Sequence, residues 1–400
     1  MHHKVKLLIE KFLNVKRHFG TAKEKKIYEG MNFEDFIVRI LKKRPLVFFG
    51  SSDMTLLRDV NDLGSMFPTE AWSRVGSEHE DDEITITEYM TYDEILIAAL
   101  IGVSVPTFFI NNGDRSNCSR KDDDGEYERE GIYVGLSGAR FERRDKMESI
   151  LMLLTEKNTT KESGYGKDAD PNNPLTQLLR TWAETYEEGD PDHKSFYFPT
   201  YTEVKEQYLT NEAFKKKFHH HAPSNRPDIF FNIAVYKKRL ALSILPFLLD
   251  ADKRAQEQNK KAYLHVVGLG LGVWQIVPEQ ATWMLETYKE LLMNHQDKLT
   301  HIHTVDFSWF PDNARSQVGI EHSVKNVVFS KRNPAEPLKD KNLLLVAMYA
   351  WDGNAFPGNE YWRGMLQASG DPAAACCSTI SELQNPYINE EFVKTIIPYQ

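Results

Sequence analysis

The sequence predicts an α/β protein in which a mixed β-sheet lies between layers of helices. Continuous apolar runs, typical of strands covered on both faces, recur along the chain and alternate with segments of helical periodicity. The clearest run, residues 343–348, leads without a break into a loop of acids, amides and glycines. Because ligands of open α/β sheets bind beyond the carboxyl ends of the strands, this loop is the first candidate for a functional site.

Composition narrows the class of protein. The 400 residues, 41% of them hydrophobic, are enough for a large core in one big domain or two ordinary ones. A net charge of −9 argues against a nucleic-acid partner. No apolar stretch is long enough to span a bilayer and the start of the chain is too charged for a signal peptide, so we expect no membrane partner and a cytoplasmic protein. The cysteine content suits a reducing compartment, and we expect no disulfide.

Helical and strand patterns follow one another along most of the chain. The patterns predict helices over 31–43, 92–101, 233–255 and 279–295, and strands over 45–50, 105–110, 132–136, 149–155, 263–267, 301–309 and 343–348. The strand at 45–50 leads into a polar turn at 51–53. We expect a helical N-terminal extension (1–44) and an α/β domain (45–400) with a long loop around 156–195.

A glycine-rich stretch follows the strand that begins at Tyr263. Glycines at a strand-to-helix junction let backbone N–H groups approach a ligand, and the helix N-terminus adds positive potential, so a diphosphate is the expected guest. The residues expected to contact it are Gly268, Leu269, Gly270, Leu271, Gly272, Val273 and Trp274. The spacing is G-x-G-x-G and the next acid, Asp306, lies too far on, which disfavours a Rossmann dehydrogenase. The alternative is a tight turn with no ligand.

The loop after 343–348 carries the candidate catalytic acids. Asp352 and Glu360 lie in it, and Asp371 follows in the sequence SGDPAAAC. The expected ligand contacts of this loop are Gly353, Asn354, Gly358 and Asn359. The alternatives are a surface turn for the loop and a helix N-cap for Asp371, because Asp-Pro before an alanine run is a good helix start.

Three weaker motifs have structural interpretations that we favour. Arg140 and Glu142 are expected to pair with each other, and Asn111 and Asn112 either contact adenine or close a turn. The histidines at 219–221 are expected on a helix, where three consecutive side chains point in different directions, so we predict no metal site.

Several stretches together resemble a known family. They are YDEILIAALIGVSVPTFFINNG (92–113), GIYVGLSGARFE (131–142), HVVGLGLGVW (265–274), GNEYW (358–362) and SGDPAAACCS (369–378). These stretches are similar to the macrodomain-like ADP-ribosyl-arginine hydrolases that include the bacterial effector MavL, over roughly residues 45 to 390. Segment 263–309 resembles the diphosphate-binding part of a macrodomain, and DGNAFPGNEYW resembles its distal-ribose loop, although their order along the chain is reversed.

The resemblance implies both fold and activity. It implies a three-layer, macrodomain-like domain that hydrolyses ADP-ribose from modified arginine side chains, with ADP-ribose as ligand and no metal or other cofactor. Asp352, Glu360 and Asp371 match the family's acidic set, with Glu360 in place of an aspartate. Its partners would be ADP-ribosylated proteins, and a bacterial effector of this kind would act in the host cytosol.

Acids suit this chemistry, and two other functions remain open. One carboxylate holds the guanidinium by bidentate hydrogen bonds, while a second activates water against the anomeric carbon. We expect Glu360 or Asp352 to be the base and the other to hold the guanidinium or the ribose. A non-catalytic ADP-ribose reader would need no positioned acids, and an NAD-dependent oxidoreductase would need an intact dinucleotide motif.

Overall fold

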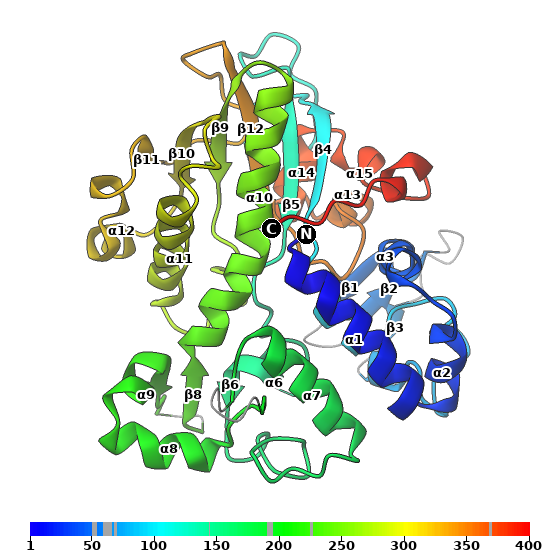
Figure 1. Cartoon of the computed structure of the whole chain (residues 1–400). Helices are drawn as coiled ribbons and strands as arrows, with labels where there is room; N and C mark the ends of the chain where they lie inside the picture. Colours follow the sequence, from blue (N-terminus) through cyan, green and yellow to red (C-terminus); the bar gives the residue numbers. More distant parts are fainter. Residues whose placement is uncertain are drawn as a thin grey trace.

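A six-stranded sheet forms the centre of the protein (Figure 1). The computed structural model describes residues 1–49, 54–58, 66–67, 70–143, 145–189, 195–224, 227–367 and 370–400, so the turn predicted at 51–53 lies outside them. The strands, in spatial order, are β11 (Val327–Ser330), β10 (Ile302–Ser308), β9 (Lys261–Val266), β12 (Leu343–Ala350), β5 (Glu130–Leu136) and β4 (Val103–Phe108). All neighbouring pairs are parallel except β4 and β5. The α/β class is therefore confirmed, as a mostly parallel sheet.

The last strand in the chain, β12, lies between β9 and β5. Val346 is opposite Leu264 of β9 on one side and Ile132 of β5 on the other. Because these three strands are parallel and in close register, their carboxyl ends lie at one edge of the sheet. The loops that follow them are separated by many residues in the sequence but begin side by side.

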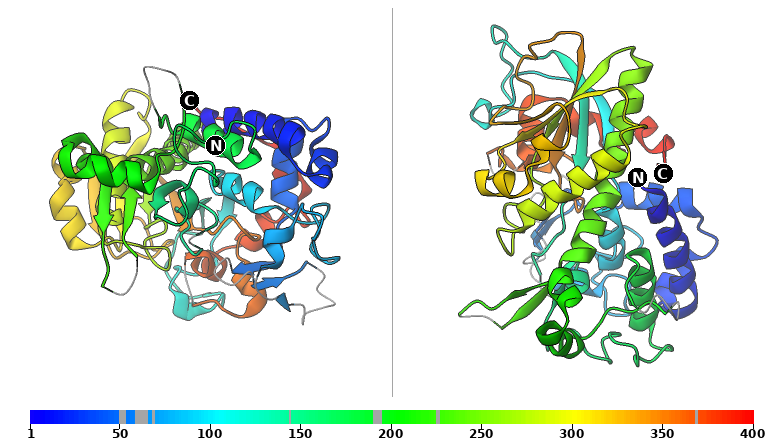
Figure 2. Two further views of the ribbon diagram at one scale, coloured as in Figure 1. Left: turned by 90° about the horizontal axis from the view of Figure 1, so that it is seen from below. Right: turned by 60° about the vertical axis from the view of Figure 1, so that its left-hand side comes forward.

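Helices cover both faces of this sheet (Figures 1 and 2). The long helix α10 (Ile233–Glu257) and α11 (Gln280–Asn294), both predicted as helices, lie on one face. Helices α14 (Gly370–Cys377) and α15 (Ile380–Leu383) lie on the other, where the hydroxyl of Tyr133 is 3.3 Å from the Cys377 sulfur and Tyr349 donates to Gln384. Strand side chains alternate between faces, so neighbouring Val134 faces α10.

The N-terminal helices share the hydrophobic core of the sheet. These helices are α1 (His3–Phe19), α2 (Ala22–Tyr28) and α3 (Phe33–Lys42). One cluster of buried apolar side chains runs from Val5 of α1 to Val346 of β12. Shorter elements complete this side and the rims of the sheet: β1 (Val47–Phe49), β2 (Met54–Leu56), β3 (Met66–Phe67), α4 (Ala71–Arg74), α5 (Tyr92–Ala98), η2 (Arg115–Asn117), α12 (Asp312–Val318), η3 (Ile320–His322), α13 (Asn359–Arg363) and η4 (Glu390–Lys394).

The segment between β5 and α10 differs most from the prediction. Its elements are α6 (Ser149–Met152), β6 (Leu153–Leu154), α7 (Pro174–Thr185), α8 (Tyr201–Thr210), α9 (Glu212–Lys217), β7 (Phe218–His221) and β8 (Ile229–Asn232). The strand predicted at 149–155 is wrong, because most of that apolar run is helix α6. The loop predicted around 156–195 contains α7, which Asn173 caps and Pro174 begins. The histidines at 219–221 lie on strand β7, not on a helix.

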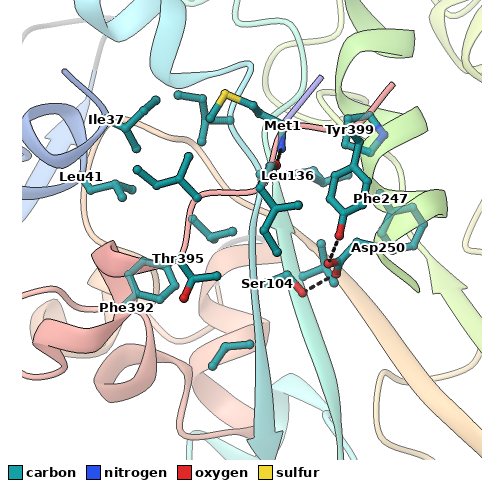
Figure 3. A pocket seen from close by; sticks show the side chains of 18 of the residues that line it. Met1, Ile37, Leu41, Ser104, Leu136, Phe247, Asp250, Phe392, Thr395 and Tyr399 are labelled. Carbon is teal, nitrogen blue, oxygen red and sulfur yellow. Dashed lines mark hydrogen bonds between the residues drawn. The ribbon is translucent and has the colours of Figure 1, made fainter. Parts of the chain in front are cut away.

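The two ends of the chain meet beside an apolar cavity (Figure 3). His3 N–H donates to Tyr399 O at 2.7 Å, and Tyr399 N–H donates to Met1 O at 2.8 Å. The cavity, about 420 Å³, lies between edge strand β4, helix α10 and the C-terminal segment. Its polar groups are paired with one another, since Asp250 accepts hydrogen bonds from Ser104 (2.8 Å) and Tyr399 (2.9 Å). Among the described helices, none is long and apolar enough to cross a membrane.

Candidate active site

Three loops converge where β5, β12 and β9 end. They are 137–142 after β5, 351–358 after β12 and 267–279 after β9. A Cβ added to Gly138 would lie 2.3 Å from the backbone nitrogen of Gly270, so the first and third loops touch through backbone. A Cβ on Gly353, whose φ is +72°, would lie 2.8 Å from Ser137 Oγ, so the second loop packs against the first. These contacts bring two predicted sites together, the glycine-rich loop and the acidic loop.

The glycine-rich loop presents unused backbone donors. Within the described residues, the N–H groups of 268–274 donate to no protein acceptor. Leu269 anchors the loop in the core, whereas Val273 is 89% exposed. Helix α11 starts only at Gln280, whose side-chain oxygen accepts from the N–H groups of Ile276 and Val277. Helix α11 therefore begins within one residue of the predicted start, and the loop amides are the donors nearest to the glycines.

The acidic loop is held in shape by Asp352 and a buried arginine. One oxygen of Asp352 accepts from the N–H groups of Asn354 (2.7 Å) and Ala355 (3.2 Å). Arg140, which is fully buried, donates to the side chain of Asn354 and to Asp352 O at 3.2 Å. The side chain of Asn354 thus stabilises the loop. Burial raises the pKa of the Asp352 carboxyl, while these N–H donors and the charges of Arg140 and Arg44 lower it.

Glu360 and Asp371 form a coupled pair beside this loop. Burial, with the charge of Asp352, raises the pKa of Glu360 to about 7, and a hydrogen bond with Asp371 opposes the rise. Burial also raises the pKa of Asp371 well above its usual range, and the charges of Glu360 and Asp352 act in the same direction. Burial and the neighbouring carboxylates thus raise the pKa of both members of the pair, so the two acids share their protons.

Asp371 connects two elements of the site. It lies in the first turn of α14, and its Oδ1 accepts from Gly358 N–H at 2.8 Å. Gly358 has a φ of +72° and immediately precedes α13, which carries Glu360. Asp371 therefore ties α14 to the acidic loop, in place of the predicted alternative in which it caps its own helix.

The structure adds Glu142 and Arg44 to the site. Burial and the charge of Asp352 raise the pKa of Glu142, and the indole N–H of Trp274 and the charge of Arg140 lower it. The predicted pair of Arg140 with Glu142 is wrong, because the ion-pair partner of Arg140 is Glu148, at 3.7 Å. Arg44 lies beside Gly353, and burial lowers its pKa to about 9. The available sequence signal for Glu142 is its place in the loop that follows a buried strand. A single arginine such as Arg44 has no sequence signal that indicates a role in the site.

Unpaired buried polar atoms are concentrated where the three loops meet. Buried side-chain atoms without a hydrogen-bond partner include Ser137 Oγ, Glu142 Oε2, Asn359 Oδ1, Glu360 Oε2, Asp371 Oδ2 and Arg44 Nη2. Native proteins rarely leave such atoms unsatisfied, so a group of them in one place indicates a missing polar ligand. The cavity in Figure 3 differs in this respect, because Asp250 and its partners there bond to one another.

Two other predicted candidates are structural. Asn111 closes a turn, since its Oδ1 accepts from Gly113 N–H at 2.8 Å and its amide donates to Arg120 O at 3.0 Å. His219 and His221 share one face of β7, with ring centroids 6.5 Å apart. In the part of the chain that the structure describes, no group of three or more His, Cys, Asp or Glu side chains is arranged to hold a metal ion.

Comparison with known proteins agrees with this site. The chain is 37% identical over 416 residues to ADP-ribosylarginine hydrolase CG3568 of Drosophila melanogaster, and the match covers 98% of this chain and 75% of that protein. It is 36% identical over 410 residues to ADP-ribosylarginine hydrolase CG2909 of the same organism, with 98% and 76% covered. Residues 1–396 match the family described as ADP-ribosylhydrolase MavL-like. The chain therefore belongs to the MavL-like ADP-ribosylhydrolase family.

Proposed function

We propose that this protein hydrolyses the bond between ADP-ribose and modified arginine side chains of other proteins. The observation that carries the proposal is the group of buried, unpaired carboxyl and amide oxygens next to a loop of free backbone N–H groups. The loop amides are complementary to a diphosphate, and the acids are complementary to a ribose and a cation. Both relatives are named for this reaction.

The diphosphate would lie over residues 268–274, and the distal ribose over 352–359. Gly270 brings the glycine-rich loop to within backbone contact of the loop after β5. Gly353 brings the acidic loop to Ser137. A ligand that spans the ends of β9, β12 and β5 would therefore cross both loops. This placement supports a macrodomain-like arrangement in which the ribose loop follows β12 and the diphosphate loop follows β9.

Glu360 is the general base in this proposal. A base works best when its pKa is near the operating pH, and Glu360 has a pKa of about 7. Asp352 has one oxygen fixed by two N–H groups of its own loop, which leaves the other for the ribose hydroxyls. Asp371, whose pKa is raised by burial and by the charges of Glu360 and Asp352, lies beside Glu360 and would orient it.

The reaction requires no redox change and no net proton. Water attacks the anomeric carbon as Glu360 takes one of its protons, and the carbon–nitrogen bond breaks with its electron pair going to the guanidine nitrogen. The proton then passes from Glu360 to that nitrogen, so the products are ADP-ribose and a free arginine guanidinium. The oxocarbenium character that develops on the ribose is stabilised by the charge of Asp352. We propose that these side chains suffice without a metal ion.

The test is release of ADP-ribose from peptides linked through arginine, glutamate or serine, read by mass spectrometry with and without a chelator. We expect release from the arginine-linked peptide alone, and no effect of the chelator. Binding of ADP-ribose without release from any peptide would instead identify a reader. Loss of release with the chelator, restored by a divalent cation, would contradict the metal-free reaction.

A further inference from the structure

Glu142 is a half-buried acid that has one buried carboxylate oxygen and no cation beside it. Its Oε2 atom has no contact with solvent and no hydrogen-bond partner. Within the described part of the chain, no ion pair involves Glu142, whereas the four glutamates that are buried as whole residues all have one. These four are Glu24 with Lys16 (2.6 Å), Glu94 with Arg39 (2.6 Å), Glu148 with Arg239, and Glu188 with Lys217 (2.8 Å). Because a buried charge is stable only when it is paired, Glu142 lacks a partner that the other four have.

The nearest arginine cannot supply that partner. Arg140 lies two residues away, but both of its terminal nitrogens already donate: Nη1 to Asp352 O (3.2 Å) and Asn354, and Nη2 to Ile95 O. Its Nε faces Glu148 at 3.7 Å. Arg140 is thus bound in an internal network, and its charge acts on Glu142 without forming an ion pair with it.

Two groups place Glu142 between the two halves of the ligand site. The indole N–H of Trp274, the last residue of the glycine-rich loop, and the charge of Asp352 both influence the pKa of the Glu142 carboxyl group, although the indole nitrogen has no hydrogen-bond partner. Glu142 is therefore next to both the diphosphate loop and the acid that would hold the ribose. The modified side chain is attached to the anomeric carbon of the distal ribose. That carbon is next to the ribose hydroxyls that Asp352 would hold.

We propose that Glu142 binds the guanidinium of the modified arginine and so makes the site selective for arginine-linked ADP-ribose. The inference rests on the proposed function. A carboxylate and a guanidinium form a bidentate pair of charge-assisted hydrogen bonds, which are the strongest of the ordinary protein hydrogen bonds. The substrate supplies the cation that Glu142 lacks, and the pair persists after cleavage because arginine leaves as a guanidinium.

Selectivity follows from the same unpaired charge. An ester or ether linkage to glutamate or serine brings no cation, so the buried oxygen of Glu142 would remain unpaired in that complex. A site built for a hydrogen-bonding group rejects ligands that lack it, because its own polar atoms stay unsatisfied. Water activated by Glu360 would attack the anomeric carbon in any of these linkages, and Glu142 is the residue that distinguishes them.

Two measurements test the role of Glu142, with Glu142→Gln as the variant. The first is hydrolysis of the arginine-linked peptide, for which kcat/KM should fall about 30-fold. The second is calorimetric binding of agmatine, a free guanidinium compound, to protein saturated with ADP-ribose. Wild-type protein should bind agmatine and the variant should bind it at least about tenfold more weakly, while affinity for ADP-ribose itself stays within about twofold.

Glu130→Gln is the matched control, because Glu130 is an exposed glutamate at the opposite end of the same strand. It should leave hydrolysis and agmatine binding unchanged. Equal agmatine binding by wild-type protein and Glu142→Gln would overturn the inference, as would a wild-type ADP-ribose complex that binds no agmatine. Wild-type protein that binds agmatine and ADP-ribose but releases nothing from the arginine-linked peptide would instead overturn the proposed function.

Discussion

The guanidinium of Arg44 lies over the ring of Trp351, with its central carbon 4.3 Å from the ring centroid. Arg44 also donates from Nε to Gly353 O at 3.3 Å, so it contacts the residues on both sides of Asp352. Arg44 follows helix α3, and it links the N-terminal helices to the acidic loop. Its side chain is buried, and no ion pair involves it in the described residues.

The variant Arg44→Met should change the pH dependence of hydrolysis. The charge of Arg44 opposes the burial that raises the pKa of Asp352. Without it the pKa of Asp352 should rise, so the acid limb of the kcat/KM profile should move to higher pH, with a rate loss of about tenfold at pH 6. Arg129→Met is the control, because Arg129 stacks on Tyr127 at 3.8 Å from its centroid, away from the acidic loop. A profile identical to that of wild-type protein would contradict this role.

The variant Gly270→Val should weaken ADP-ribose binding. Gly270 has a φ of +66°, and a Cβ there would lie 3.0 Å from Ala139 O, so a branched side chain would push the glycine-rich loop away from the loop after β5. We expect at least a tenfold loss of affinity by calorimetry, about 1.4 kcal/mol. Gly30→Val matches it, because Gly30 has a φ of +68° and no atom within 4 Å of an added Cβ. Equal affinity in folded Gly270→Val would place the diphosphate elsewhere.

Glu360→Gln and Asp352→Asn should separate turnover from binding. Glu360→Gln keeps the size and hydrogen-bonding capacity of the side chain but removes the base, so single-turnover release of ADP-ribose should slow by about 10²- to 10⁴-fold with little change in affinity. Asp352→Asn should slow release and also weaken ADP-ribose binding, because Asp352 would hold the ribose. Each variant is measured by release from an arginine-linked peptide and by calorimetry. Wild-type rates from both would favour a non-catalytic reader.

Glu360→Gln should also stabilise the fold at alkaline pH. The pKa of Glu360 is raised from 4.5 to about 7, so the folded protein holds this proton more tightly than the unfolded chain. The stability associated with the raised pKa is complete below pH 4.5 and is lost as pH rises through 7. Urea unfolding should therefore show the variant more stable than wild-type protein by about 1–3 kcal/mol at pH 8, with no such difference at pH 4. If the variant were more stable than wild-type protein by the same free energy of unfolding at both pH values, the stabilisation would come from packing and not from the raised pKa.

The central sheet was predictable because its strands are continuous buried runs. Such runs identify β12, β10, β9, β5 and β4, and the strong periodicity of 233–255 identifies α10. A short apolar run is ambiguous, however, since SILMLLT at 149–155 fits a strand by composition and is mostly helix. The cluster of Pro, Asn and Asp before α7 has the composition of a loop, although Asn173 and Pro174 also form a good helix start.

The site was predictable only where it follows a strand. Asp352, Glu360 and the glycine-rich loop were candidates from the sequence because polar residues after buried strands lie at the ligand-binding edge of a sheet. The place of Glu142 depends on the insertion of β12 between β9 and β5, which brings the loop after β5 to both other loops. Strand order is a tertiary property, and nothing in the local pattern around Glu142 or Arg44 reports it.

The first and last residues of the chain lie next to each other and are hydrogen-bonded. Met1 and His3 pair with Ile397 and Tyr399 through backbone groups at 2.7 to 3.0 Å, so a short peptide could join the termini without distorting the native structure. A covalent ring has fewer unfolded conformations than an open chain, and closure would therefore stabilise the protein by an entropic effect on the unfolded state. It would also permit circular permutants in which new ends open in a surface loop distant from the site. In such permutants α1 would follow the C-terminal segment along the chain. Arg44 and Asp352 would keep their contacts, although the order of the elements between them in the sequence would change.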